Sequence, residues 1–122
     1  MIVAGFGFRA AASAASLRNA YDLACGAHRP QCLATAADKA QSPAFVALSR
    51  ALGLPIRAVP PQRLAQQGTA TRSATSMAAR GTGSVAEAAA LAAAGAGATL
   101  LQPRRISTDR MATCALAEGE NE

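Results

Sequence analysis

Residues 2–13, Ile-Val-Ala-Gly-Phe-Gly-Phe-Arg-Ala-Ala-Ala-Ser, join a short apolar run to an alanine-rich segment through two glycines. The pattern predicts a strand, a tight turn at Gly5 and Gly7, and a helix that starts at Ser13. Glycine lets the backbone come close to a ligand, and the free N–H groups of a helix's first turn favour an anion. We therefore expect a ligand-binding corner at the carboxyl end of this first strand.

The rest of the chain alternates between predicted helices and strands. Apolar spacing, capping residues and breakers place helices at 13–27, 42–52, 62–67 and 84–94, and strands at 31–36, 54–59, 98–102 and 111–117. This alternation predicts an α/β fold, a single three-layer domain whose largely parallel sheet of about five strands is flanked by helices. The last two strands should form an antiparallel hairpin around the basic turn 103–110.

Two segments carry no predicted helix or strand. Residues 68–83 are rich in Gly, Thr, Ser, Ala and Arg, a composition typical of a loop. Residues 118–122 are acidic and read as a frayed tail. We therefore expect one α/β domain over residues 1–117, which suits a chain of 122 residues.

Composition excludes several classes of protein. No apolar run approaches the roughly 18 residues of a membrane span, and no signal region opens the chain, so we expect a cytoplasmic protein with no membrane partner. The net charge of +5 is spread along the chain and aromatic residues make up only 3%, which argues against nucleic acid. Cys25, Cys32 and Cys114 form no Cys-x-x-Cys pair, so we expect buried thiols and neither a metal site nor a cofactor.

Eleven of the 12 basic residues are arginine and only Lys39 is lysine. Arginine binds carboxylates through two parallel hydrogen bonds, so a ligand with several carboxylates would suit this chain. A coding bias towards alanine and arginine would give the same ratio, and the composition alone does not separate the two explanations.

Polar residues that could serve a site lie after predicted strands or at helix starts. Asp38 and Lys39 follow the second strand and would lie beside the glycine turn if the two strands are neighbours. Ser84 and Glu87 form a capping-box pattern, in which each side chain bonds the other residue's backbone N–H. No residue set indicates a catalytic nucleophile with its base, so the catalytic residues stay unknown.

The spacing Gly5-x-Gly7-x-x-Ala10 is also a degenerate form of the dinucleotide-binding fingerprint. A nucleotide-binding fragment is therefore a remote alternative. The acidic residue that should follow the second strand would have to be Asp38, which comes later than the usual spacing of about 20 residues.

Four segments, taken in order, resemble the family of CobE and the C-terminal domain of CbiG, from cobalamin biosynthesis. They are Gly5-Phe-Gly7-Phe-Arg9, Ala36-Ala-Asp38-Lys39 followed by Pro43, Leu52-Gly-Leu-Pro55, and Gly81-Thr-Gly-Ser84-Val-Ala-Glu87. The resemblance covers nearly the whole chain. One departure is Phe8, which stands where family members usually carry cysteine, so a nucleophilic cysteine at that position is missing from this chain.

The resemblance implies a compact α/β domain of the stand-alone CobE type that binds or hands on a carboxylate-rich tetrapyrrole intermediate. It implies ligand-binding roles for residues of the strand ends and helix starts, namely Gly5, Gly7, Arg9, Ser13, Asp38, Lys39, Ser84 and Glu87, with support from Arg104 and Arg105. Two alternatives stay open. The domain would be a catalytic or docking part of a CbiG-like cobalt-precorrin-5A hydrolase, or it would dock onto other cobalamin-pathway enzymes without a ligand of its own. A binding or carrier role is favoured over independent catalysis.

Overall fold

The computed structural model describes residues 1–67 and 84–119. The loop predicted at 68–83 and residues 120–122 of the predicted tail lie outside the described part. In chain order the elements are β1 (Ile2–Phe8), α1 (Ala14–Cys25), β2 (Cys32–Ala36), a 3-10 helix (Ala37–Lys39), α2 (Pro43–Leu52), β3 (Ile56–Val59), α3 (Pro61–Ala65), α5 (Val85–Ala94), β4 (Thr99–Ile106) and β5 (Ala112–Glu118).

The strands form one sheet in the order β3-β2-β1-β5-β4. β1, β2 and β3 pair in parallel, whereas β5 is antiparallel to both β1 and β4. Four of the strands therefore share one direction and only β5 runs the other way. This confirms the largely parallel five-stranded sheet and the antiparallel C-terminal pair.

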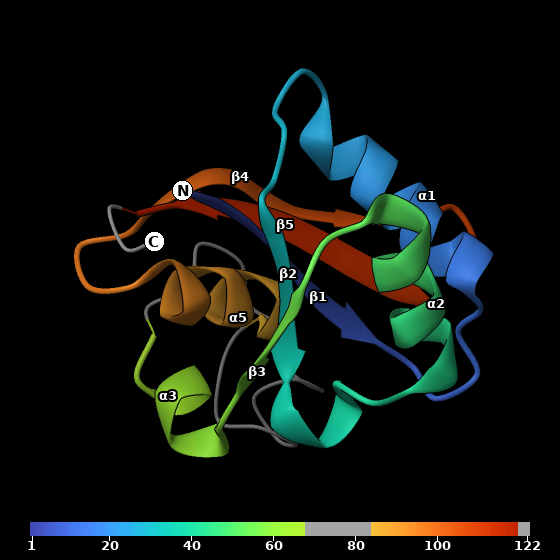
Figure 1. Ribbon diagram of the computed structural model, residues 1–122, viewed down its shortest axis with the longest axis horizontal. Coiled ribbons are helices and arrows are strands. Elements are labelled where there is room, and N and C mark those ends of the chain that lie inside the picture. Colours follow the sequence, from blue (N-terminus) through green and yellow to red (C-terminus); the bar gives the residue numbers. More distant parts are fainter. Residues whose placement is uncertain (68–83, 120–122) are drawn as a thin grey trace.

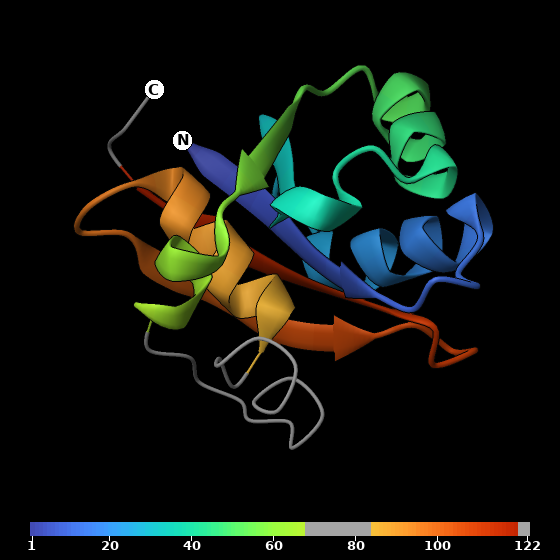
Figure 2. The same cartoon turned by 90° about the horizontal axis from the view of Figure 1, so that it is seen from below.

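Helices cover both faces of the sheet (Figures 1 and 2). α1 and α2 lie on one face, where they pack around Phe6, Leu17 and Phe45. α3 and α5 lie on the other face, against Val3 and Ala34. The predicted three-layer α/β domain is therefore confirmed.

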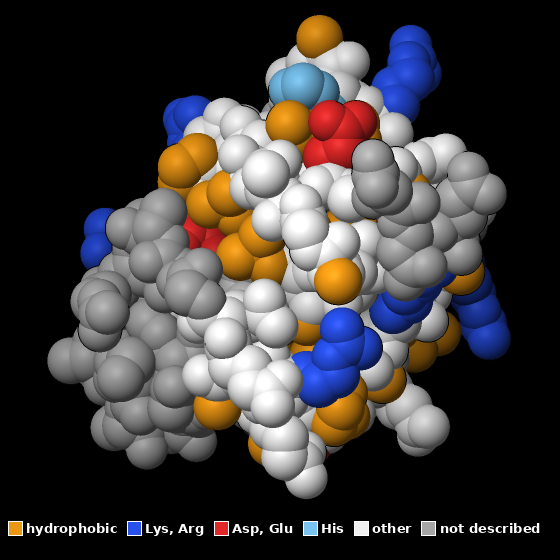
Figure 3. All heavy atoms as spheres, turned by 90° about the vertical axis from the view of Figure 1, so that its left-hand side faces the viewer, with side chains coloured by type: hydrophobic (Ala, Val, Ile, Leu, Met, Phe, Trp, Pro, Cys, Tyr) orange, Lys and Arg blue, Asp and Glu red, His pale blue; other side chains and the backbone are white. Residues whose placement is uncertain are grey.

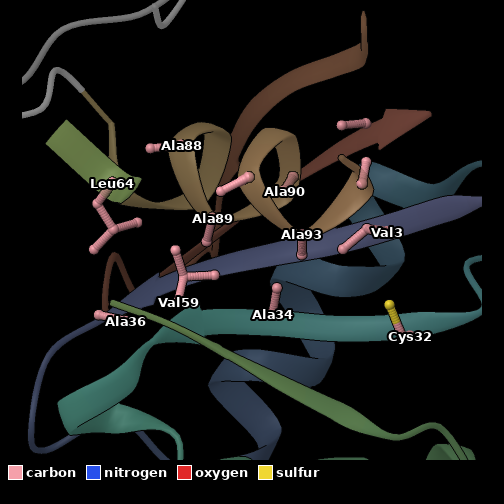
Figure 4. Close-up of a cluster of buried hydrophobic side chains, with 13 residues drawn as sticks. Val3, Cys32, Ala34, Ala36, Val59, Leu64, Ala88, Ala89, Ala90 and Ala93 are labelled. Carbon is pink, nitrogen blue, oxygen red and sulfur yellow. The ribbon is translucent and has the colours of Figure 1, made fainter. Parts of the chain in front are cut away.

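Alanine side chains fill most of the contact between α5 and the sheet. Seven alanines of α5 are buried, and Ala89 and Ala93 point towards the strands beneath the helix (Figure 4). Because alanine side chains are short, the helix axis can come close to the sheet, and Val59 and Leu64 fill the space at the side. The core on this side of the sheet is therefore built largely from small residues.

The predicted turn at Gly5 and Gly7 is wrong, because β1 continues through both glycines to Phe8. Gly5 faces α5, and a Cβ added to it would lie 2.1 Å from the carbonyl oxygen of Ala86 and 2.5 Å from the backbone nitrogen of Ala90. Gly5 therefore provides room for a helix that crosses directly over the strand. The strand–turn–helix arrangement that a dinucleotide fingerprint needs at these glycines is not present.

The C-terminal strands also extend further than the sequence predicted. β4 continues through Pro103 to Ile106, with irregular pairing to β5 between Leu100 and Gln102 and again between Gln102 and Arg105. Proline is tolerated here because β4 is an edge strand of the sheet that the described residues form. β5 includes Glu118, so the first residue of the predicted tail belongs to the sheet.

Candidate functional site

The parallel pairing of β1 and β2 ends before their carboxyl ends. Their parallel pairing is regular from Val3 to Gly5, and beyond it side chains take over. The hydroxyl of Thr35 donates to the Phe6 carbonyl at 2.9 Å, and the Lys39 ammonium donates to the Phe8 carbonyl at 2.9 Å. In open α/β sheets, ligands bind in crevices outside the carboxyl ends of the strands, so this end of the sheet is the natural place to look for a site.

Four residues at this end of the sheet are called the strand-end site below: Phe8, Arg9, Asp38 and Lys39. The Lys39 Nζ lies 4.9 Å from the centroid of the Phe8 ring, a cation–π arrangement. Phe8 also stacks on Phe45, with ring centroids 5.6 Å apart and planes 20° apart. The half-buried Phe8 ring thus contacts both a core aromatic residue and a cation.

The charged residues around Phe8 remain accessible. Arg9 and Asp38 are exposed, and Lys39 is half-buried. The backbone N–H of Arg9 donates to the Met111 carbonyl at 2.9 Å, which holds the end of β1 against the start of β5. The structure therefore brings Lys39 to the end of β1, as expected if the first two strands are neighbours, and Arg9 and Asp38 adjoin this contact in the chain.

Ser13 starts α1 as predicted. The anionic group at this helix start is a carboxylate of the protein itself, that of Asp109. The Ser13 hydroxyl accepts from the Ser16 N–H at 3.1 Å, and the Ser16 hydroxyl donates to Asp109 Oδ2. Hydrogen bonds from the Ser107 hydroxyl, the Ser16 hydroxyl and the Met111 N–H lower the pKa of the Asp109 carboxyl. Asp109 thus takes the place where the sequence predicted an anionic ligand.

Ser84 and Glu87 lie at the start of α5 and are fully buried. The Ser84 hydroxyl accepts from the Glu87 N–H at 3.2 Å, which confirms the predicted helix start. Glu87 Oε2 accepts from the backbone N–H of Arg104 in β4 at 2.9 Å. The Glu87 carboxylate therefore links α5 to the edge strand β4. A Cβ on Gly7 would lie 3.2 Å from the Val85 Cβ, which places the start of α5 over the end of β1.

Sequence reasoning missed three parts of this region. Thr35 and Thr113 bond to carbonyls of β1, with the Thr113 hydroxyl donating to the Gly7 carbonyl at 3.1 Å. Asp109 joins the turn before β5 to α1. The alternation of small residues in β2 gave no sign that Thr35 would bond sideways to β1. The Ser107-x-Asp109 spacing is typical of a local turn, but it does not predict the contact of Asp109 with α1.

The strand-end site holds two cations, one carboxylate and one aromatic ring. In residues 1–67 and 84–119, no three His, Cys, Asp or Glu side chains come together as in a metal site. Helices of this described part are too short or too polar to span a membrane. Basic side chains are spread over the face shown in Figure 3, separated by neutral and hydrophobic ones.

The structure is a small α/β domain with three accessible charged side chains at the carboxyl ends of β1 and β2. Over residues 2–117 the chain matches the family model described as "Cobalamin synthesis G C-terminus". It also resembles the crystal structure of CobE, a protein from the cobalamin (vitamin B12) biosynthetic pathway, with a TM-score of 0.88 and 32% identity over 100% of this chain and 92% of CobE. The chain therefore belongs to the CobE/CbiG C-terminal family of cobalamin biosynthesis proteins.

Two further solved structures are similar. Cobalamin biosynthesis protein chiG from Agrobacterium tumefaciens str. C58 has a TM-score of 0.73 and 32% identity over 99% of this chain and all of chiG. A putative cobalamin biosynthesis protein G homolog from Sulfolobus solfataricus has a TM-score of 0.73 at 17% identity, over 98% of this chain and 37% of the homolog, and shows the shared fold alone. Among the curated proteins, none matches the chain.

Proposed function

We propose that this protein binds a carboxylate-rich tetrapyrrole intermediate of cobalamin biosynthesis at the strand-end site and hands it on. The observation that carries the proposal is the placement of Lys39, whose ammonium donates to the Phe8 carbonyl at the end of β1 and lies over the Phe8 ring. Membership of the family gives the pathway.

The chemistry of the site suits a flat ring with acidic substituents. Phe8 offers part of an aromatic ring for contact with a macrocycle, and Lys39 and the exposed Arg9 offer charge to its carboxylates. Neighbouring strands are about 4.8 Å apart, so a wide ligand at this edge would also reach the start of β5 and the end of β4. Arg104 and Arg105 near the end of β4 are the next cations along this edge.

A carrier role is favoured over hydrolysis by the groups at this site. General acid–base catalysis needs a side chain that accepts or donates a proton beside a second polar group. Asp38 is an exposed carboxylate, and Lys39 already donates to a backbone carbonyl. Both residues suit recognition of charge better than proton transfer.

Variants of the two cations test the proposal. Arg9→Ala and Lys39→Met are titrated by visible absorbance with cobyrinic acid, a cobalt corrin with free carboxylates. Each variant should bind about tenfold or more weakly, because each loses a hydrogen bond between charged groups. Arg50→Ala, which removes an exposed cation from α2, is the matched control and should bind like the wild type. Unchanged affinity in both site variants, with folding verified by circular dichroism, would sink the proposal.

A further inference from the structure

A second polar feature lies beside the C-terminal half of α5. Two adjoining depressions of about 320 Å³ and 230 Å³ run between α5, β3 and α3, and Arg63 and Ala92 line both. Arg57 lines the larger one, and Gln66 and Gln67 line the smaller one. We call this feature the arginine groove.

The two arginines of the groove are held in place by the helix end. Arg57 Nη1 donates to the Ala93 carbonyl at 2.7 Å, and Arg63 Nη2 donates to the Ala92 carbonyl at 2.6 Å. These carbonyls belong to the last turn of α5, where no helical N–H reaches them. Because the carbonyls are on consecutive residues, the two guanidinium groups approach the same short piece of helix.

Capping the helix uses only a small part of each guanidinium. Arginine carries five N–H donors in a fixed fork, and the helix carbonyl takes one donor from each side chain. Arg57 also makes a weak contact with the Met1 sulfur at 3.9 Å. Within residues 1–67 and 84–119 no further hydrogen bond takes the other donors, and Arg63 is exposed to solvent.

No carboxylate of the described residues pairs with either arginine. The ion pair found among residues 1–67 and 84–119 is Arg18 with Asp22, on α1. Two permanent positive charges therefore converge on one groove without a counter-charge from this part of the chain. The negative end of the α5 dipole offsets them only in part.

We propose that the arginine groove is a second binding site, for a ligand that carries at least two carboxylates. Arg57 and Arg63 each bind one carboxylate, and the Gln66 and Gln67 amides add neutral donors beside Arg63. The ligand is a free small polycarboxylate or the carboxylate edge of a corrin. The inference does not rest on the proposed function, because a small polycarboxylate tests it without a corrin.

The groove is separate from the strand-end site. α5 begins over Gly7 and ends beside Gly119, where a Cβ added to Gly119 would lie 2.2 Å from the Ala94 carbonyl oxygen. Gly119 in turn bonds to Met1, at the start of β1. With 10 residues the helix is about 15 Å long, so the strand-end site lies near its start and the groove near its end.

Citrate is the first probe. Amide and arginine side-chain signals are followed by NMR while citrate is added to the ¹⁵N-labelled full chain at constant ionic strength. We expect saturable shifts of Ala92, Ala93 and the Arg57 and Arg63 Nε–H signals, with an affinity on the order of millimolar. Shifts spread evenly over all exposed arginines would overturn the proposal, because they would show general charge screening.

Variants separate binding from helix capping. Arg57→Gln with Arg63→Gln removes both charges and should weaken citrate about tenfold or more. Arg57→Lys with Arg63→Lys keeps both charges and thus their favourable interaction with the end of α5, so this variant should remain folded. It loses the paired hydrogen bonds to a carboxylate and should therefore bind citrate severalfold more weakly. Arg50→Gln is the control and should bind like the wild type. Unchanged citrate affinity in the folded lysine pair would contradict the proposal.

A titration with cobyrinic acid then identifies the source of the carboxylates. Weaker cobyrinic acid binding in the glutamine pair would support the groove as a contact for the corrin edge. A loss of citrate binding alone would support a free small polycarboxylate as the ligand. If neither probe binds the glutamine pair more weakly than the wild type, the proposal is wrong, whatever the outcome for Arg9 and Lys39.

Discussion

The backbone N–H of Arg104 donates a 2.9 Å hydrogen bond to the carboxylate of Glu87, a side chain with no exposed surface. The bond joins the first turn of α5 to edge strand β4 across 17 residues of sequence. It thereby fixes the arginine pair 104–105 relative to the helix start. Glu87 is therefore a structural link of the region where the sequence predicted a ligand contact.

Removal of this link should destabilise the domain. Glu87→Ala leaves the Arg104 N–H without its acceptor and opens a space in the core, so the free energy of unfolding should fall by about 2 kcal/mol or more. Glu87→Gln keeps an acceptor oxygen and should cost about half as much. Urea unfolding followed by circular dichroism measures both. Glu118→Gln, an exposed position in β5, is the control, and an Ala variant as stable as that control would refute the link.

Gly5→Ala should be more damaging than Gly7→Ala. At Gly5 the new methyl group meets the Ala86 carbonyl oxygen and the Ala90 backbone nitrogen, which cannot turn away. At Gly7 its nearest neighbours are side-chain atoms of Thr113 and Val85 at 3.1 and 3.2 Å, which need to move only slightly. We expect a loss of about 3 kcal/mol or more at Gly5 and about 1 kcal/mol at Gly7. Equal losses in thermal and urea unfolding would show that α5 does not require a glycine beneath it.

Asp109 should make stability depend on pH. Hydrogen bonds from Ser107, Ser16 and the Met111 N–H lower the pKa of its carboxyl from the ordinary 3.8, so the folded state favours the ionised form. The stabilisation is fully present above about pH 4, the pKa range of the unfolded chain, and is lost as the pH falls through the lower folded pKa.

The test compares the wild type with Asp109→Asn. The variant should have a lower Tm at pH 7, and the difference should shrink as the pH falls below about 4. Differential scanning calorimetry across this range measures the effect. A Tm difference that stays constant down to about pH 2 would mean that ionisation of Asp109 contributes nothing to folding.

The thiols should be unreactive in the folded protein. Cys25, Cys32 and Cys114 are all buried, and burial raises the pKa of Cys25 to about 11. Because the thiolate is the reactive form, a disulfide reagent at about pH 8 should label the native protein slowly and the urea-unfolded protein rapidly. Fast labelling of Cys25 in the native state would contradict its packed environment.

Local signals predicted most of the elements. Ser13 and Ser84 start helices through their hydroxyl groups, and Gly53 ends α2 in a left-handed conformation, all as the residue types suggested. These features depend on neighbours within a few residues in the chain. The alternation of strands and helices along the chain also predicted the three layers correctly.

Errors arose where a distant segment decides the structure. Gly5 looked like a turn residue because its partner, α5, lies about 80 residues away in the sequence. Pro103 looked like a strand stop, but pairing with β5 carries β4 through it at an edge. Likewise, the place of Asp109 at the start of α1 depends on a contact across 93 residues, which no local pattern contains.

Binding of a corrin with free carboxylates is the central claim, and a visible-absorbance titration of the wild-type protein tests it most directly. Cobalt-free and cobalt-containing corrins with free acetate and propionate groups are compared with cobinamide, in which these groups are amides. We predict a saturable spectral shift with the acids, and a much weaker one with cobinamide because its amides lack the charge that Arg9 and Lys39 recognise. The absence of any shift, or an equal affinity for the acids and for cobinamide, would contradict the account.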